Sequence, residues 1–240
     1  MNSVEETSVS INNVKDSNRK SKQQENRPKS SKRIPLRILI IEPSGRYCRS
    51  VWCAIGLGIV HVLIGATVMS VLIYALKRGD THAALCNIAY HFFSAEAILS
   101  LNYANGWSTP MRLRHRRLTH VLLQMCAMVL AVTGTVLITL DKGISTSAHG
   151  LTGLITTVLA CLAFLSGPCG LFGGRYLKLF HITFGIPAFI MSSISFCLGL
   201  CMPAFKEWAG VTAMYILIGF IVFYTSFIMI TCFIKCAMRI

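Results

Sequence analysis

Residues Met111–Gln124 read Met-Arg-Leu-Arg-His-Arg-Arg-Leu-Thr-His-Val-Leu-Leu-Gln, and this stretch decides how the chain is placed. Four arginines crowd a short segment between two long apolar runs, and His120 stands at the start of the second run. Cytoplasmic loops of membrane proteins accumulate Lys and Arg, so the arginines indicate an orientation. Ionisable side chains are costly inside a bilayer, so a histidine at this position calls for an explanation.

The sequence around this stretch is too apolar for an ordinary soluble protein. Of its 240 residues, 54% are hydrophobic and 13% are charged, and the mean hydropathy is +0.61. An apolar run of about 20 residues is long enough to span a bilayer. We therefore predict an all-α membrane protein with six transmembrane helices. The six runs lie at residues 50–76, 81–111, 118–140, 143–174, 179–205 and 208–234.

The formal charge of +14 is distributed unevenly along the chain. The tail up to Arg49, the second and fourth loops and the C-terminal end together carry nineteen Lys and Arg, whereas the other loops carry four. Both termini are therefore predicted to be cytoplasmic. A basic soluble protein would suggest binding to nucleic acid, but here topology accounts for the charge, and we expect no nucleic-acid partner.

The composition divides the chain into three regions. Residues 1–49 are a basic cytoplasmic tail, predicted to be disordered because it has too few large apolar residues to form a core. Within the tail, residues 34–43 are too short to span a membrane and suit a position along its surface. Residues 50–235 form the six-helix domain, and residues 236–240 form a cytoplasmic end. The ten cysteines lack a zinc-type or redox Cys-x-x-Cys spacing, which favours packing roles.

Four of the seven histidines stand near the starts of four consecutive predicted spans: His82, His120, His149 and His181. Alternate spans run in opposite directions, so His82 and His149 share the non-cytoplasmic side, whereas His120 and His181 share the cytoplasmic side. Neutral imidazole is the commonest metal ligand, so paired histidines on facing helices suggest a bound metal or haem iron. The alternative for each one is an interfacial, hydrogen-bonded histidine.

Four segments that contain these histidines resemble the cytochrome b561 family, and within it the animal cytochrome b561 domain-containing proteins. The segments are Thr81-His82 followed by Glu96-Ala-Ile-Leu, Leu118-Thr-His120-Val-Leu-Leu-Gln, Ala148-His149-Gly-Leu-Thr-Gly-Leu, and Lys178-Leu-Phe-His181-Ile-Thr-Phe-Gly. The similarity covers about residues 50 to 235 and leaves out the tail.

This resemblance implies a four-helix di-haem core made by predicted helices two to five. It implies two haem b groups, one held by His82 and His149 and the other by His120 and His181. It also implies electron transfer from cytosolic ascorbate to monodehydroascorbate or ferric iron on the opposite side, which is the activity of an ascorbate-dependent transmembrane oxidoreductase. The alternative from another class is a non-haem six-helix transporter or membrane scaffold with structural histidines.

Other polar residues are placed by helical phase. Glu96 lies fourteen residues after His82, close to four turns, and is predicted on nearly the same face. There it would tune the cytoplasmic haem, pass a proton or pack as a neutral acid. Gln124 is a second haem-tuning candidate, with a hydrogen bond between helices as the plainer alternative. His91 is out of phase with His82 and is not counted as a ligand, and His61 is read as an interhelical hydrogen-bonding residue.

Basic side chains near His120 are candidates for binding ascorbate, a monoanion whose oxygens accept charge-assisted hydrogen bonds. They are Arg112, Arg114, Arg116, Arg117 and Lys178. For about half of them the alternative is a purely topological role. The expected partners are membrane lipid, ascorbate, and monodehydroascorbate or a ferric chelate, and a homodimer is left open. We expect a multi-pass protein of an endomembrane or vesicle membrane in preference to the plasma membrane.

Overall fold

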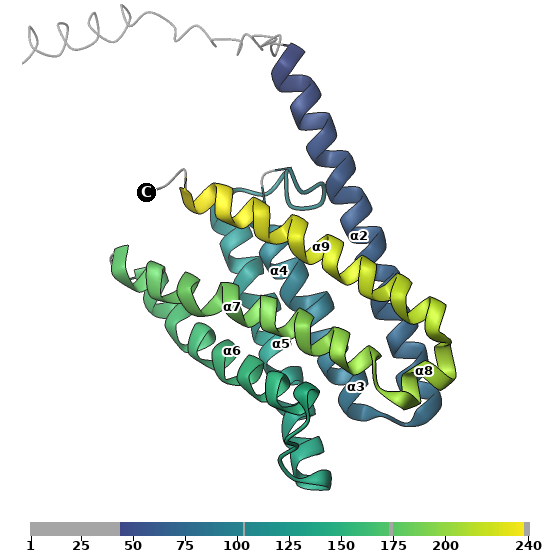
Figure 1. Cartoon of the computed structure of the whole chain (residues 1–240). Helices are drawn as coiled ribbons and strands as arrows, with labels where there is room; N and C mark the ends of the chain where they lie inside the picture. The colour runs from purple at the N-terminus through teal and green to yellow at the C-terminus, as the bar shows by residue number, and fades with distance from the viewer. Residues whose placement is uncertain (1–43, 103, 173–174, 238–240) are drawn as a thin grey trace, which may run out of the picture. The chain divides into compact units, whose positions relative to one another are not determined.

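Helices make up nearly all of the structure, which is a computed structural model describing residues 44–102, 104–172 and 175–237 (Figure 1). In chain order the elements are α2 (Ser44–Arg78), α3 (Thr81–Cys86), η1 (Asn87–Ser94), α4 (Ala95–Ser100), α5 (Leu113–Lys142), α6 (Ala148–Phe172), α7 (Arg175–Leu200), α8 (Pro203–Ala209) and α9 (Val211–Ala237). No strand occurs within these described ranges. The prediction of an all-α protein is confirmed.

Five of the helices, α2, α5, α6, α7 and α9, are long and apolar enough to cross a membrane. The predicted second span is built differently, because α3, η1 and α4 follow one another without a break from Thr81 to Ser100 and η1 is a π-helix. Their combined length is comparable to the roughly 20 residues of a spanning helix. The chain is therefore a multi-pass helical membrane protein.

All five long helices start at residues other than the predicted ones, as α2 and α5 illustrate. α2 begins at Ser44, inside the segment predicted as tail, and α5 begins at Leu113, five residues before its predicted start. Three of the four arginines of this basic segment therefore lie in the first turns of α5. Arg and Leu are good helix formers, so α5 can begin within the basic segment. The charges indicate the expected membrane boundary, which lies inside the helix. The predictions for residues 1–43 fall outside the described ranges.

Tight connections join the helices at one end of the domain. Gly79, Gly143 and Gly210 have φ values of 66°, 72° and 81°, a left-handed conformation that glycine adopts without a Cβ clash. Asp80 caps α3, because its side chain accepts a hydrogen bond of 2.9 Å from the backbone N–H of Ala83. The cap residue Asp80 lies two residues before His82 and fixes the start of α3 at Thr81.

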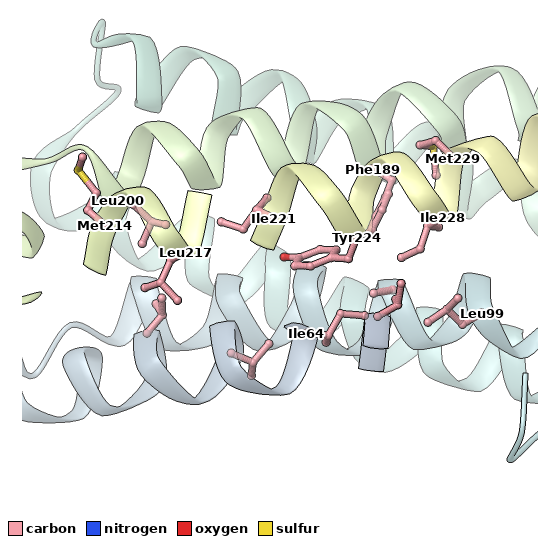
Figure 2. Close-up of a cluster of buried hydrophobic side chains, with 14 of the residues drawn as sticks. Ile64, Leu99, Phe189, Leu200, Met214, Leu217, Ile221, Tyr224, Ile228 and Met229 are labelled. Carbon is pink, nitrogen blue, oxygen red and sulfur yellow. The ribbon is translucent and has the colours of Figure 1, made fainter. Parts of the chain in front are cut away.

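The main hydrophobic core lies where α2 and α9 pack against α4 and α7 (Figure 2). Ile64 of α2 and Ile221 and Tyr224 of α9 are at most 1% exposed, and Leu99 of α4 and Phe189 of α7 join them. The first and last long helices thereby form one side of the domain. α5 and α6 have long exposed apolar faces, as expected for helices that face lipid.

The four middle spans form two antiparallel hairpins. α6 and α7 run side by side, and α5 packs along α3, η1 and α4 (Figure 1). We call these the α6–α7 hairpin and the α3–α5 hairpin. Antiparallel packing places the start of each helix beside the end of its hairpin partner, and the four candidate histidines stand near these starts.

Candidate functional site

The four predicted ligand histidines form two facing pairs. His82 of α3 faces His149 of α6, with ring centroids 6.1 Å apart and ring planes at 77°. His120 of α5 faces His181 of α7, with centroids 6.2 Å apart and planes at 88°. In each pair the two rings come from different hairpins, so both sites lie between the α3–α5 and α6–α7 hairpins.

A main-chain carbonyl holds each of the four rings. In every case the ring Nδ1 lies within hydrogen-bond distance of a carbonyl oxygen on the other helix of the same hairpin. The four bonds are His82 to Gly134 (3.0 Å), His120 to Ala97 (2.8 Å), His149 to Ser195 (2.9 Å) and His181 to Ala163 (2.8 Å). A carbonyl only accepts, so Nδ1 bears the hydrogen and donates it. With Nδ1 protonated in this way, a lone pair at Nε2 is the one that could bind a metal.

On three of the helices, the histidine and the carbonyl residue are separated by the same number of residues. On α5, α6 and α7 the carbonyl residue comes fourteen residues after that helix's own histidine: Gly134 after His120, Ala163 after His149, and Ser195 after His181. Fourteen residues are close to four α-helical turns, so the histidine and the carbonyl residue lie on the same helix face. One helix thus supplies a candidate ligand near one end and an orienting carbonyl near the other.

In the second span this separation is fifteen residues, from His82 to Ala97, and the π-helix η1 lies between them. A π-helix has more residues per turn than an α-helix, because its hydrogen bonds run from residue i to i+5. It therefore accommodates the additional residue while keeping Ala97 directed toward His120. This gives the π-helix a role in building the site.

Two glycines allow neighbouring helices to approach the histidines closely. A Cβ added at Gly199 of α7 would lie 3.1 Å from Cε1 and 3.3 Å from Nδ1 of His149. A Cβ added at Gly134 would lie 2.9 Å from Sγ of Cys86, one turn after His82. Small residues at these contacts let the ring of His149 and the end of α3 sit against the facing backbone.

The geometry fits haem iron held between the two rings of each pair. Two metal–nitrogen bonds of about 2 Å and about 1 Å from each nitrogen to its ring centre add to roughly 6 Å, close to the observed centroid separations. Among the described residues, no group of three or more His, Cys, Asp or Glu side chains could hold a bare metal ion. Two imidazoles complete the coordination of an iron that already has four porphyrin nitrogens.

The prediction that Glu96 shares the face of His82 is wrong. Oε1 of Glu96 lies 2.7 Å from Nδ1 of His61 on α2, and Nε1–H of Trp107 donates to Oε2 at 3.0 Å. The additional residue in η1 puts Ala97, not Glu96, in phase with His82. Glu96 therefore turns toward α2, beside the carbonyl that holds His120.

Gln124, the other haem-tuning candidate, makes a hydrogen bond between helices. Its Oε1 accepts from Oγ–H of Ser94 at 3.2 Å, which links α5 to η1. His91 does not join either histidine pair. Nδ1 of His91 lies 2.6 Å from the hydroxyl of Tyr224 on α9, and its ring stacks on Phe196 at a centroid distance of 4.1 Å.

The candidate ascorbate-binding residues differ in burial. Arg116 is 4% exposed, and its Nε and Nη2 donate to the carbonyls of Met111 (3.2 Å) and Thr109 (2.8 Å) in the loop before α5. Arg116 therefore stabilises that loop. The other candidates are exposed at the same end of the domain: Arg112, Arg114, Arg117 and Lys178.

A multi-pass helical protein with two such histidine pairs has the architecture of a membrane-bound cytochrome. The chain belongs to the eukaryotic cytochrome b561 family, whose sequence pattern matches residues 81–206, more than half of its length. That match includes all four paired histidines. As a family, cytochromes b561 bind haem b.

Among curated proteins, the chain is similar to the transmembrane reductase CYB561D2 of three mammals. The Homo sapiens and Bos taurus proteins are each 29% identical over 133 residues, which cover 50% of this chain and 60% of the relative. The Mus musculus protein is 26% identical over 191 residues, which cover 72% of this chain and 83% of the relative. In the human and bovine matches the chain spans less than two thirds of the relative's length.

Proposed function

We propose that this protein is a transmembrane oxidoreductase that passes electrons across a membrane through two b-type haems. One haem would be held by His82 and His149, and the other by His120 and His181. The observation that carries the proposal is the pair of facing histidines near each end of the domain, each ring held by a carbonyl through Nδ1. The names of the similar mammalian proteins support a reductase.

A haem held by two of these histidines would have no position left for an oxygen ligand, so it would supply one-electron transfer and not oxygen chemistry. The chain supplies four oriented ligands. The Nδ1–H bonds to carbonyls fix the ring positions and make Nε2 a better donor. On α5, His120 and Gly134 mark the levels of the two sites, which are roughly 21 Å apart along the helix. This distance is most of a hydrocarbon layer of about 30 Å.

Electrons would enter at the end that contains His120 and His181, with cytosolic ascorbate as the donor. The excess of Lys and Arg in the loops at this end supports a cytoplasmic orientation. The exposed side chains Arg112, Arg114, Arg117 and Lys178 would bind the ascorbate anion. At the other end, exposed Lys77 and Lys142 would attract an anionic acceptor, either monodehydroascorbate or a ferric chelate.

Sealed vesicles that contain the purified protein and a trapped ferric chelate would test this function. Ascorbate added outside should reduce the trapped iron in vesicles whose Arg112–Arg117 segment faces outward. A His149→Gln variant should keep the haem at His120 and His181 but fail to reduce the trapped iron. If the wild-type protein carries two haems and the trapped iron stays oxidised, electron transfer across the membrane is contradicted.

A further inference from the structure

Glu96 and His61 form a polar network that the haem ligands do not use. Oε1 of Glu96 and Nδ1 of His61 are 2.7 Å apart, and His61 Nε2 is 2.9 Å from Oδ1 of Asn105. Trp107 donates to the other carboxyl oxygen, Oε2, at 3.0 Å. The network joins α2, α4 and the loop at residues 101–112.

The heavy-atom geometry calls for one proton between Glu96 and His61. Nδ2 of Asn105 donates to the carbonyl of Leu99 at 3.1 Å, which leaves Oδ1 as the acceptor for Nε2–H of His61. The 2.7 Å contact between Nδ1 and Oε1 then requires one hydrogen, on either the ring or the carboxyl group. In both forms the pair is neutral overall. Loss of the shared proton would give the pair a charge of −1.

The pair is next to the anchor of one haem ligand. Ala97, the residue after Glu96, supplies the carbonyl that holds His120 at 2.8 Å. The side chains of His61 and Glu96 are 28% and 14% exposed, and Trp107 is 40% exposed, so the network is not sealed inside the protein. The exposed arginines of the adjoining segment place this end near water.

We propose that the Glu96–His61 pair takes up one proton when a haem held by His120 and His181 is reduced, and releases it on oxidation. This inference rests on the proposed function, because it requires a haem at that site. One electron from ascorbate would reduce a ferric haem at this site to the ferrous form and lower the local charge by one. The arriving proton, from the donor or from water, converts the pair from −1 to neutral. Atoms and charge then balance at one proton for each electron.

Other ionisable groups on elements packed against the pair have other contacts or lie at the surface. Arg116 binds loop carbonyls, His120 faces His181, and His91 bonds to Tyr224. Arg112 is exposed, and on α9 the ionisable groups up to Ile234 are Tyr215, Tyr224 and Cys232. Within the described residues, the Glu96–His61 pair is the carboxylate–imidazole contact at this end of the domain.

Redox titration of the full-length, haem-loaded protein from about pH 6 to about pH 8 tests the inference. In the wild type, the midpoint potential of the haem at His120 and His181 should fall by up to 59 mV per pH unit, the value for one proton per electron. A His149→Gln variant lacks a ligand of the other haem, so only the haem at His120 and His181 remains. The potential of this haem should keep the same dependence on pH. In Glu96→Gln the midpoint potential should no longer change with pH. In Glu96→Asp, which keeps a carboxyl group, the dependence on pH should remain.

Ser193→Ala, which removes a buried 2.9 Å hydrogen bond to Thr225, is a matched control that should keep the slope. A flat wild-type titration, or a slope that persists in Glu96→Gln, would overturn the inference and leave the proposed function intact. Absence of bound haem would overturn both, and absorbance shows this before any titration.

The wild type also allows a test without variants, because its reduced-minus-oxidised infrared spectrum should contain carboxyl or imidazole bands that shift in D2O. Absence of such bands would likewise contradict proton uptake.

Discussion

Residues of the same type have different roles in this protein because their burial differs. Arg116 is buried and donates to the carbonyls of Thr109 and Met111, whereas Arg114 and Arg117 on the same two turns are exposed. A guanidinium group that binds backbone carbonyls stabilises a loop, and an exposed one is available to an anion. The structure thus separates the arginines that the sequence presents as one basic group.

Replacing both Arg114 and Arg117 with alanine should raise the KM for ascorbate several-fold with little change in thermal stability. Removing exposed charges weakens anion binding but breaks no buried contact. Arg116→Ala should instead lower the free energy of unfolding by about 1–3 kcal/mol, because buried carbonyls lose their donors. Ascorbate oxidation kinetics and thermal melts would measure these effects. Equal stability losses in the two proteins would contradict the assignment.

Gln124→Leu and His120→Leu differ by one helical turn and should have different effects on haem. The first removes the hydrogen bond from Ser94, worth about 0.6 kcal/mol in membrane proteins, and should leave the haem content unchanged. The second removes a ligand and should reduce the haem content by half. Haem quantitation on the purified variants would decide. Loss of a haem in Gln124→Leu would show that Gln124 contacts the cofactor.

The four ligand candidates could be predicted from the sequence, but their supports could not. Histidine is rare in apolar spans, so each of the four stands out, and the direction of the spans pairs them. Every residue has a carbonyl group, so nothing in the sequence marks those of Ala97, Gly134, Ala163 and Ser195. The Glu96 prediction failed because helical phase was counted through a π-helix as though it were an α-helix.

At the scale of elements, η1 explains how four unequal spans build two similar sites. Three helices use a separation of fourteen residues between the candidate ligand and the carbonyl residue, and the predicted second span uses fifteen with a π-helix between them. π-helical segments are rare and often occur at functional sites. Apolar periodicity does not reveal one additional residue in a span, so the sequence alone does not show this feature.

Deleting Phe92 from η1 should preserve both haem sites. The deletion leaves fourteen residues between His82 and Ala97, which suits a regular α-helix. Phe92 is 42% exposed, so its loss costs little packing. Deleting Val129, an exposed residue of α5, should turn Gly134 by about 100° relative to His120 and release the ring of His82. Haem content of the two variants provides the comparison, and similar losses in both would contradict the proposed role of η1.

Gly199→Val should displace the His149 ring and weaken haem binding at His82 and His149 by about tenfold or more. Changes that disturb the orientation of a metal ligand typically cost this much affinity. The first added carbon alone would lie 3.1 Å from the His149 ring. Gly65→Val in α2 is the matched control, since an added Cβ there meets no atom within 4 Å. Haem retention during dilution would be measured. Equal retention in both variants would argue against close packing at Gly199.

At the scale of the whole molecule, the apolar runs and the distribution of charge were enough to predict a helical multi-pass protein. Five long helices agree with that prediction, and the predicted second span coincides with the segment α3–η1–α4. Helix starts were less predictable, because charge indicates the expected membrane boundary whereas helix propensity and capping set the helix boundary. The packing of α2 and α9 into the main core depends on contacts between residues distant in sequence.

Electron paramagnetic resonance of the oxidised, purified protein, with haem quantitation, tests the two-haem claim most directly. The ring planes in the two pairs lie at 77° and 88°, so two imidazoles held in this way would interact almost equally with two perpendicular orbitals of a haem iron. This geometry predicts two haems per chain, both with highly anisotropic low-spin signals, and one signal should disappear in each single histidine variant. A chain without low-spin haem, or one that binds a single haem unaffected by replacement of His82 or His149, would contradict the two-site assignment.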